Sequence, residues 1–309
     1  MAGGAGRTEG AGGTAGAGGT GGAGGAPTPR AVAVERLAPG DHACLPSEGP
    51  EGRWALRAAF AAAGLARGER VLLFPGAGAE PAHTLERLAA HGVPAGQAAA
   101  DGRLAVIRDF PGYDPVRGFE PEVRTGYLVR AAEVARARGF TGLRAAGDMA
   151  WATGPGVDGE ALTAYERNLT PLFAELGFTG LCEYDRRAFP PELLDPLLRT
   201  HPLSVVPVPG ALHAVRDGDV LRLAGDADLA TRTAFELAVR EPGLALIDLT
   251  GLAFLDAHCA RELVRLGASP SGASPGPSVH CTGAQARLLK MCGMRTAGDL
   301  SGGVVRGAR

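Results

Sequence analysis

At 309 residues the chain is long enough for two folded domains, and a hydrophobic content of 45% is ample for packed cores. A formal net charge of -2 gives no electrostatic footprint for nucleic acid or an anionic membrane. No apolar run is long enough for a membrane span and the N-terminus lacks a signal-peptide core, so we expect a cytoplasmic protein. The five cysteines are scattered without a CxxC pair, which argues against a disulfide framework and against a classical zinc site.

Residues 1–30 consist largely of glycine, alanine and threonine and offer almost nothing apolar to bury. The glycines do not recur at every third position and proline is nearly absent, which excludes a collagen-like helix. The stretch therefore predicts a disordered tail ahead of the first folded unit.

Helical and strand patterns alternate across residues 31–206. Segments with apolar residues at helical spacing end at glycines and are followed by short apolar runs typical of buried strands. Such alternation predicts an α/β domain with a parallel sheet and helices on both faces. Helices are expected at 56–65, 84–91, 123–138 and 162–176, and strands at 70–74, 104–107, 143–146 and 180–184.

A proline-rich stretch at 202–210 is expected to stiffen the chain, with residues 207–210 as the linker between two domains. A smaller α/β domain is predicted over 211–309. Its expected elements are strands at 212–216, 220–223, 244–249 and 279–282, helices at 231–239, from 260, and at 285–291, and a loop at 268–278.

The phrase GLARGERVLLF at 64–74 resembles the segment that follows the first helix of RecA- and KaiC-type ATPases. The resemblance implies a phosphate loop at 47–54, SEGPEGRW, at the start of that helix. A working loop needs a lysine for the phosphates and a Ser or Thr for Mg²⁺, and Arg53 and Trp54 stand at those positions. We interpret the segment as an ATPase scaffold without ATPase chemistry, or as a flexible glycine loop.

Five phrases resemble the MEDS domain, a sensory domain related to that ATPase scaffold. They are GDHAC at 40–44, AAGDMAW at 145–151, YERNL at 165–169, LCEYDRRAF at 181–189 and RTHPL at 199–203. The resemblance covers roughly residues 36–206 and implies a site that senses small hydrocarbon-derived ligands. Asp148 departs from the family, which usually has glutamate at that position.

His42 and Cys44 are two residues apart, so both side chains face the same way in an extended segment. That spacing allows joint contact with a ligand or a soft metal, and it equally fits a satisfied histidine beside a buried thiol. Glu166, on its predicted helix, fits either an ion pair with arginine or a ligand contact.

Asp148 and Asp185 lie at the carboxyl ends of predicted strands, where doubly wound sheets bind ligands. Trp151 and Tyr184 could supply an apolar wall with a polar handle. The candidate ligand-binding set is therefore His42, Cys44, Asp148, Trp151, Glu166, Tyr184 and Asp185. No cofactor is expected, and the sequence leaves a metal open.

In the second domain, Asp256 is a good N-cap between an apolar pair and the helix from Ala260. A helix N-terminus at the end of a strand is a place where ligands and partners are met.

The run DLTGLAFLD at 248–256 resembles the STAS domain, the fold of anti-sigma factor antagonists, and GDAD at 225–228 resembles the phrase before that family's first helix. The family's two serines, one of them the phosphoacceptor, fall on Ala257 and His258, and neither residue can become a phosphoserine. The resemblance implies an anti-sigma factor or related serine-kinase-fold protein as partner. The implied binding face comprises Asp226, Asp228, Asp256, Ala257 and His258.

Together these observations predict a cytoplasmic signalling regulator in which a small-ligand sensor domain is coupled to a protein-binding domain. No nucleophile–base set is evident, so no enzymatic step is expected. Two alternatives stay open: a nucleotide hydrolase or transferase on the RecA-like scaffold, and a scaffold subunit of a larger signalling assembly.

Overall fold

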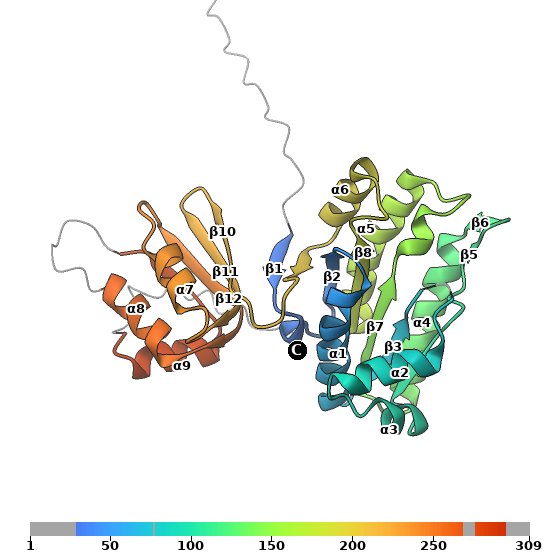
Figure 1. The fold of residues 1–309 in the computed structure, drawn as a ribbon, viewed down its shortest axis with the longest axis horizontal. Helices are drawn as coiled ribbons and strands as arrows, with labels where there is room; N and C mark the ends of the chain where they lie inside the picture. The colour runs from blue at the N-terminus through green and yellow to red at the C-terminus, as the bar shows by residue number, and fades with distance from the viewer. Residues whose placement is uncertain (1–28, 77, 268–275, 295–309) are drawn as a thin grey trace, which may run out of the picture.

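The computed structural model describes residues 29–76, 78–267 and 276–294 (Figure 1). The tail predicted at 1–30 lies outside the described residues except for Pro29 and Arg30, as does most of the loop predicted at 268–278. None of the described helices is long and apolar enough to cross a membrane.

The larger unit is built on a seven-stranded sheet in which every neighbouring pair of strands is parallel. The strand order is β1-β9-β2-β8-β7-β3-β4. The strands are β1 (Arg30–Val32), β2 (His42–Ser47), β3 (Arg70–Phe74), β4 (Leu104–Val106), β7 (Leu143–Asp148), β8 (Phe178–Asp185) and β9 (Leu203–Val205).

Helices cover both faces of this sheet, as Figure 1 shows. One face packs against α1 (Pro50–Ala66), α2 (Pro81–Ala90) and α3 (Ala95–Ala100), and the other against α4 (Pro121–Ala137), α5 (Gly159–Leu176) and α6 (Pro191–Thr200). Two short 3-10 helices, η1 (Val34–Arg36) and η2 (Ala150–Thr153), and a small hairpin of β5 (Tyr113–Asp114) and β6 (Gly118–Phe119) complete the unit. The prediction of a parallel sheet with helices on both faces is confirmed.

The predicted bounds of the strands agree with the structure more closely than the predicted starts of the helices do. The strand expected at 70–74 matches β3 residue for residue, whereas α1, α2 and α4 each begin two to six residues before the expected start. Each of these helices has proline in its first turn, where the missing N–H costs no hydrogen bond. Helix α6 was not predicted. It contains Pro196, and it persists because it buries Leu194 and Leu197 against the sheet.

Alternate side chains of each strand face opposite sides of the sheet. His42 and Cys44 on β2 face the α4–α6 layer, whereas Leu45 faces the α1 layer. On β8, Cys182 likewise faces α5 while Glu183 contacts Arg57 of α1. This alternation follows from the two-residue repeat of a strand.

The direction in which successive strands are added to the sheet changes at the boundary between β3 and β7. The helix after β3 (α2) and the helix after β7 (α5) cover opposite faces, although the two strands are neighbours. Ligands bind at such switch points in open α/β sheets, just beyond the carboxyl ends of the strands.

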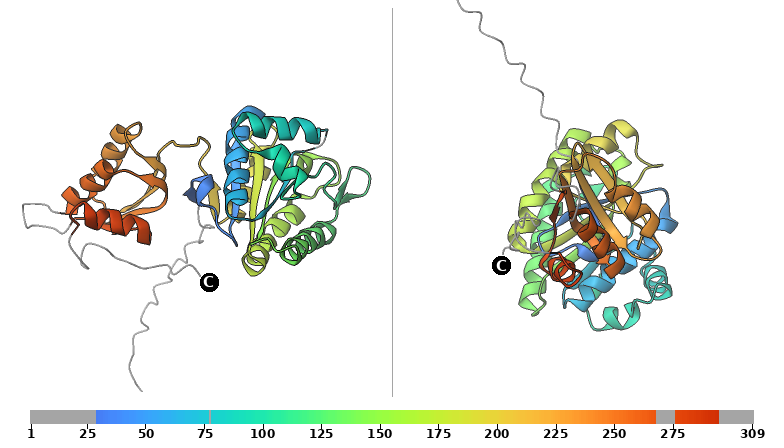
Figure 2. Two further views of the ribbon diagram at one scale, coloured as in Figure 1. Left: turned by 90° about the horizontal axis from the view of Figure 1, so that it is seen from below. Right: turned by 90° about the vertical axis from the view of Figure 1, so that its left-hand side faces the viewer.

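The smaller unit is a four-stranded sheet in the order β10-β11-β12-β13, with β10 antiparallel and the others parallel. Its strands are β10 (His213–Asp217), β11 (Val220–Ala227), β12 (Leu246–Leu255) and β13 (Ser278–His280), and its helices are α7 (Arg232–Val239), α8 (Ala257–Gly267) and α9 (Gly283–Met291). The helices lie on the side of the sheet away from the larger unit (Figures 1 and 2).

The strand predicted at 244–249 ends too early, because β12 runs on to Leu255. The strand absorbs the irregular stretch through register shifts against β11, between Arg222 and Ala224 and between Gly225 and Asp226. Bulges of this kind bend a strand and keep it in the sheet. The RecA-like and STAS-like descriptions of the two units stay predictions.

The two units meet through small residues. Ala31, Ala33 and Val206 of the larger unit pack against Ala224 and Ala253 of the smaller sheet. The carbonyl of Ala31 would lie 2.7 Å from a Cβ at position 251, where the chain has glycine. Arg30 Nη1 also donates to Thr250 Oγ1 at 3.3 Å. The sheet edge at β1 therefore contacts the open face of the second sheet.

Candidate functional site

A fully buried group of polar side chains lies between the sheet and the α5–α6 layer. It comprises His42 on β2, Glu166 on α5, Cys182 on β8 and His201 at the end of α6. Glu166 Oε2 lies 3.3 Å from His42 Nε2 and 3.4 Å from His201 Nε2. The Cys182 thiol lies 3.5 Å from both His42 Nε2 and Glu166 Oε2. We call these four residues the buried donor cluster.

Burial sets the electrostatics of this cluster. Burial first, and the neighbouring His201 second, lower the pKa of His42 to about 4, so its imidazole is neutral near pH 7. Burial alone would raise the pKa of Glu166, yet His201 and His42 outweigh it and hold that pKa well below the usual range. Burial and the Glu166 charge raise the pKa of the Cys182 thiol well above its usual value.

Hydrogen bonds orient the two imidazoles. His42 Nδ1 lies 2.9 Å from Thr170 Oγ1, and His201 Nδ1 lies 2.9 Å from the carbonyl oxygen of Leu197. A carbonyl can only accept, so His201 Nδ1 carries its proton there. The other ring nitrogen, His201 Nε2, then faces Glu166.

Tyr184 and Cys44 lie near this cluster without joining it. The Tyr184 hydroxyl is buried without a hydrogen-bond partner among the described residues, and burial and the Glu166 charge raise its pKa well above the usual value. Cys44 Sγ donates to the Leu203 carbonyl at 3.5 Å, and burial raises its pKa to about 12. Although His42 and Cys44 share a strand face as predicted, the thiol beside His42 in the cluster is Cys182.

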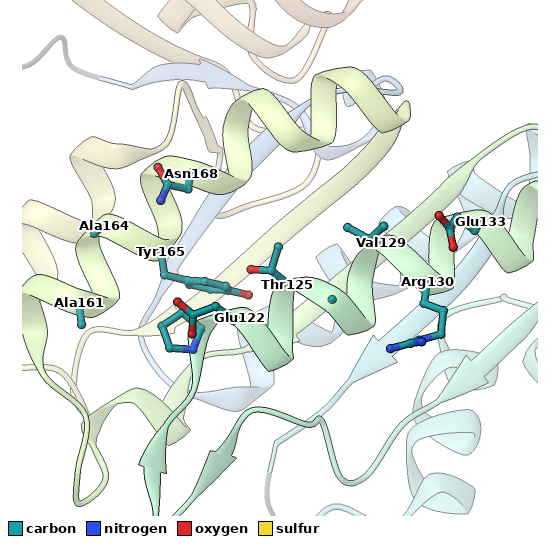
Figure 3. Close-up of a pocket in the computed structure, with 11 residues that line it drawn as sticks. Glu122, Thr125, Val129, Arg130, Glu133, Ala161, Ala164, Tyr165 and Asn168 are labelled. Atoms are coloured by element: carbon teal, nitrogen blue, oxygen red, sulfur yellow. The ribbon is translucent and has the colours of Figure 1, made fainter.

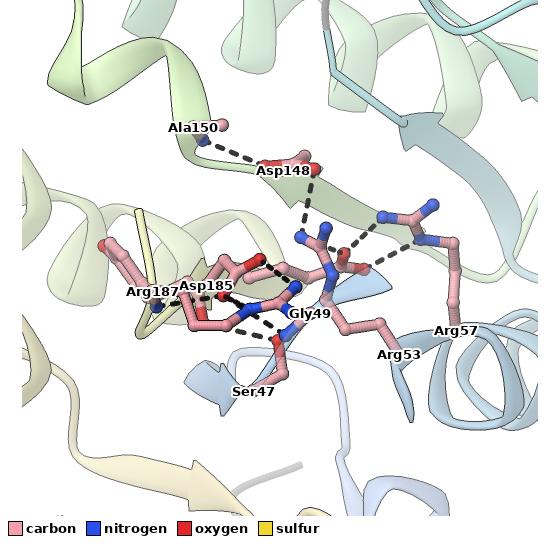
Figure 4. Close-up of polar contacts among 10 residues, drawn as sticks. Ser47, Gly49, Arg53, Arg57, Asp148, Ala150, Asp185 and Arg187 are labelled. Carbon is pink, nitrogen blue, oxygen red and sulfur yellow. Dashed lines mark hydrogen bonds and ion pairs between the residues drawn. The ribbon is translucent and has the colours of Figure 1, made fainter. Parts of the chain in front are cut away.

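A second polar network lies at the carboxyl ends of β7 and β8 (Figure 4). Arg53 Nη1 donates to Asp148 at 3.0 Å and lies 3.7 Å from Glu183. Arg57 pairs with both carboxylate oxygens of Glu183, one of them at 3.0 Å. Burial raises the pKa of Asp148, an effect that the nearby Arg53 charge opposes.

The stretch predicted as a phosphate loop, 47–54, spans the end of β2, the turn at 48–49 and the start of α1. Its Gly49, with φ of 90°, donates its backbone N–H to Asp185 Oδ1 at 3.2 Å. The Arg187 guanidinium lies so close that a Cβ at Gly49 would be 2.1 Å from its Nη2. The Asp185 carboxylate therefore accepts a hydrogen bond from the N-terminus of α1, the helix end that would face a phosphate in an ATPase.

An aromatic pocket of about 290 Å³ opens at the β3/β7 switch point. It is lined by Phe74, Gly76, Gly78, Arg108, Asp109, Phe110, Tyr113, Pro115, Arg124, Asp148 and Trp151. Within it the Arg124 guanidinium lies between two rings, 3.9 Å from the centre of Phe110 and 4.0 Å from that of Trp151. Arg124 is 2% exposed, and burial lowers its pKa to about 10.

A larger surface groove of about 770 Å³ runs between α4 and α5 (Figure 3). Its lining includes short side chains such as Thr125 and Ala164 and the charged Glu122, Arg130 and Glu133. It contains none of the predicted site residues.

In the smaller unit the residues of the predicted binding face lie at the carboxyl ends of β11 and β12. Asp256 Oδ1 accepts from the Cys259 N–H at 2.7 Å and so caps α8, as expected. Asp228 accepts from the first N–H groups ahead of α7, and its charge adds to burial in raising the pKa of Asp226. His258 Nε2 lies 2.9 Å from Glu236, and Ala257 begins α8.

Comparison with known families places the larger unit. A family model described as MEDS, the methanogen/methylotroph, DcmR sensory domain, matches residues 41–202, more than half of the chain. The chain belongs to the MEDS family. A comparison with curated proteins found no match. The MEDS range contains the buried donor cluster, the carboxylate–arginine network and the aromatic pocket, and it indicates a sensor role. It ends before the second unit, so the STAS likeness stays a prediction.

The structure divides the predicted ligand residues of the MEDS unit among these places. His42 and Glu166 lie in the buried donor cluster, with Tyr184 beside it, and Asp148 and Trp151 line the aromatic pocket. Asp185 binds the start of α1 and Cys44 packs against β9.

Sequence reasoning missed three residues: Cys182, His201 and Arg124. The first two stand inside phrases that carried the MEDS resemblance, so the signal was present but not assigned. Arg124 had no signal, because an arginine on a helix is normally solvated.

Proposed function

We propose that the MEDS unit senses a small organic anion in the aromatic pocket, and that the second unit transmits the state of this pocket to a protein partner. The observation that carries the proposal is the buried, ring-stacked Arg124. Its side chain enters the pocket at the switch point where this class of sheet binds ligands.

Arg124 lacks the partner that a buried guanidinium normally has. Within the described part of the chain it makes no ion pair, its Nε has no acceptor, and its Nη2 donates only to the Phe110 carbonyl at 3.4 Å. Buried charges are costly unless paired, and arginine is suited to bidentate contact with carboxylate or phosphate groups. A ligand with one anionic group would supply the missing acceptors.

The rest of the pocket suits an apolar body. Phe74 stacks on Phe110 with ring centres 4.0 Å apart, and Tyr113 lies against Trp151 at 5.4 Å. A volume of about 290 Å³ admits only a small molecule. This supports a short hydrocarbon skeleton carrying a carboxylate or similar group, which refines the expected hydrocarbon-derived ligand.

Several features support a sensor without an enzymatic step. Arg53 pairs with carboxylates where an ATPase has its catalytic lysine, and Asp185 takes the helix N-terminus that would bind phosphate. The output that we propose is the STAS-like face around Asp256, bound by an anti-sigma factor or related serine-kinase-fold protein. With Ala257 and His258 at the serine positions, the sensor rather than phosphorylation would control this binding.

The ligand site is tested by thermal unfolding of the full chain with short-chain carboxylates and with alcohols of the same carbon skeleton. A ligand at a hundredfold excess over Kd stabilises the protein by about 2.7 kcal/mol, which raises the unfolding temperature measurably. We expect stabilisation by a carboxylate, lost in Arg124→Gln and kept in Arg130→Gln, an exposed arginine of the same helix. Stabilisation by the alcohols alone, or retained in Arg124→Gln, would refute the role of Arg124, and tight binding of ATP with Mg²⁺ would favour an enzyme.

The output face is tested by capture of partners from extract of the native cells. We expect Asp256→Lys to weaken capture of an anti-sigma-type protein by roughly 1–3 kcal/mol in binding free energy, because it reverses a charge in the proposed interface. Asp219→Lys, at the opposite end of β11, serves as the control and should leave capture unchanged. Equal effects of the two substitutions would place the partner elsewhere.

A further inference from the structure

The buried donor cluster has the composition and spacing of a metal site. His42 Nε2, Glu166 Oε2, Cys182 Sγ and His201 Nε2 come from four different elements, and all four atoms lie within 4.8 Å of one another. Their exposed fractions are between 0% and 8%. Nitrogen, sulfur and carboxylate oxygen are the donors that zinc takes in proteins.

Four of the six separations between the donor atoms match a tetrahedron, and the other two are within 4.8 Å. Zinc bonds of about 2.0–2.2 Å to nitrogen or oxygen and 2.3 Å to sulfur place N and O donors about 3.4 Å apart, and S about 3.6 Å from either. The two N–O distances are 3.3 and 3.4 Å, and the two distances from sulfur are both 3.5 Å. One ion at the centre would therefore reach its donors with little movement of the side chains.

Two atoms of the cluster lack a hydrogen-bond partner. His201 Nδ1 lies against the Leu197 carbonyl, so its Nε2 faces Glu166 Oε2 at 3.4 Å. Neither His201 Nε2 nor Glu166 Oε1 has a hydrogen-bond partner in the described part of the chain. A metal ion bound to His201 Nε2 and to the Glu166 carboxylate would give both side chains a partner.

The charges of the four side chains also favour a bound divalent ion. A divalent ion with one thiolate, one carboxylate and two neutral imidazoles forms a site of zero net charge, which suits a dry interior. Binding exchanges the Cys182 thiol proton for the metal and releases that proton to solvent. The contacts of His42 with Thr170 and of His201 with Leu197 are the outer-shell hydrogen bonds that orient metal-bound histidines.

We propose that His42, Glu166, Cys182 and His201 bind one zinc ion in a closed, structural, four-coordinate site. The ion would join β2, α5, β8 and the end of α6, and so fix the α5–α6 layer on the sheet. The proposal is independent of ligand sensing at Arg124, because the two sites share no residue.

The test measures the metal content of the untagged full chain purified without chelator, followed by zinc titration of the stripped protein against a competing chelator dye. We expect one zinc per chain. Cys182→Ser and His201→Gln should weaken zinc binding at least about a hundredfold, since even outer-shell changes cost up to that much. Cys44→Ser is the matched control, a buried thiol on the same sheet face that bonds to backbone, and it should bind zinc as the unchanged protein does.

Cobalt substitution separates metal binding from mere stability. The unchanged protein and Cys44→Ser should show a thiolate-to-cobalt charge-transfer band, and Cys182→Ser should lack it, with circular dichroism confirming the fold of each. If a variant does not fold, the spectrum of the unchanged protein decides. Absence of both retained zinc and the cobalt band would overturn the proposal, and equal loss in Cys44→Ser would overturn the donor assignment.

Discussion

Replacing Arg57 by methionine should destabilise the MEDS unit strongly, because it strands a buried carboxylate. The side chains of Arg57 and Glu183 are 5% and 0% exposed, and the pair is made through two contacts. Removing one partner of a buried ion pair costs about 3–5 kcal/mol. Arg53 stays 3.7 Å from Glu183 and offsets part of the loss, so we expect about 3 kcal/mol.

The matched control is Arg87→Met. Arg87 pairs with Glu51, whose side chain is 77% exposed, and such pairs contribute less than about 1 kcal/mol. Arg57 and Arg87 both lie over the ring of Trp54, at 4.7 and 5.2 Å, so loss of that cation–π contact is common to both variants.

Urea unfolding followed by tryptophan fluorescence measures the effect on the correct unit, since both tryptophans, Trp54 and Trp151, lie in it. A shift of the midpoint at constant slope reports the change in free energy of unfolding. Replacing Arg57 and Glu183 together by methionine should recover most of the loss. If Arg57→Met costs no more than Arg87→Met, the network is not the buried structural element inferred here.

Three further outcomes are expected, which concern substitution of two glycines, the N-cap of α8 and phosphorylation of the smaller unit. Gly180→Ala should cost about 1–3 kcal/mol in thermal unfolding, because its Cβ would lie 2.2 Å from the Phe173 ring, whereas Gly147→Ala, with its nearest atom at 4.0 Å, should be close to neutral. Asp256→Ala should destabilise the smaller unit by about 1 kcal/mol through loss of the α8 cap, measured by urea unfolding followed by circular dichroism, and no change would argue against the cap. After incubation with a serine kinase and ATP, mass spectrometry should find residues 250–262 unmodified. A phosphate there would contradict the prediction, because it would show that a kinase can control this face.

The fold of the MEDS unit could be predicted well because its signals are local. The run of apolar residues at 70–74 marks β3 to the residue, and alternating elements predict a parallel sheet. The errors occurred where local signals conflict with packing. Helix α6, which contains Pro196, was not predicted, and the strand predicted at 244–249 continues as β12 to Leu255.

The candidate sites were predicted only in part, because their members come from distant parts of the chain. The Cys182 thiol meets His42 across 140 positions, and nothing near either residue encodes that contact. Arg124 was missed for the same reason, because its burial depends on the rings of Phe110 and Trp151, which come from other parts of the chain.

By itself the sequence determined the alternation of helices and strands that predicts a parallel sheet, the N-cap at Asp256, and the replacement of the ATPase lysine by Arg53. These depend on periodicity and on residue identity at single positions. The tertiary structure alone decided which side chains share a site. On β8 the two-residue repeat sends Cys182 toward Glu166 of α5 and Glu183 toward Arg57 of α1. Which helix covers each face depends on the direction in which every crossover runs, and that is a property of the whole sheet.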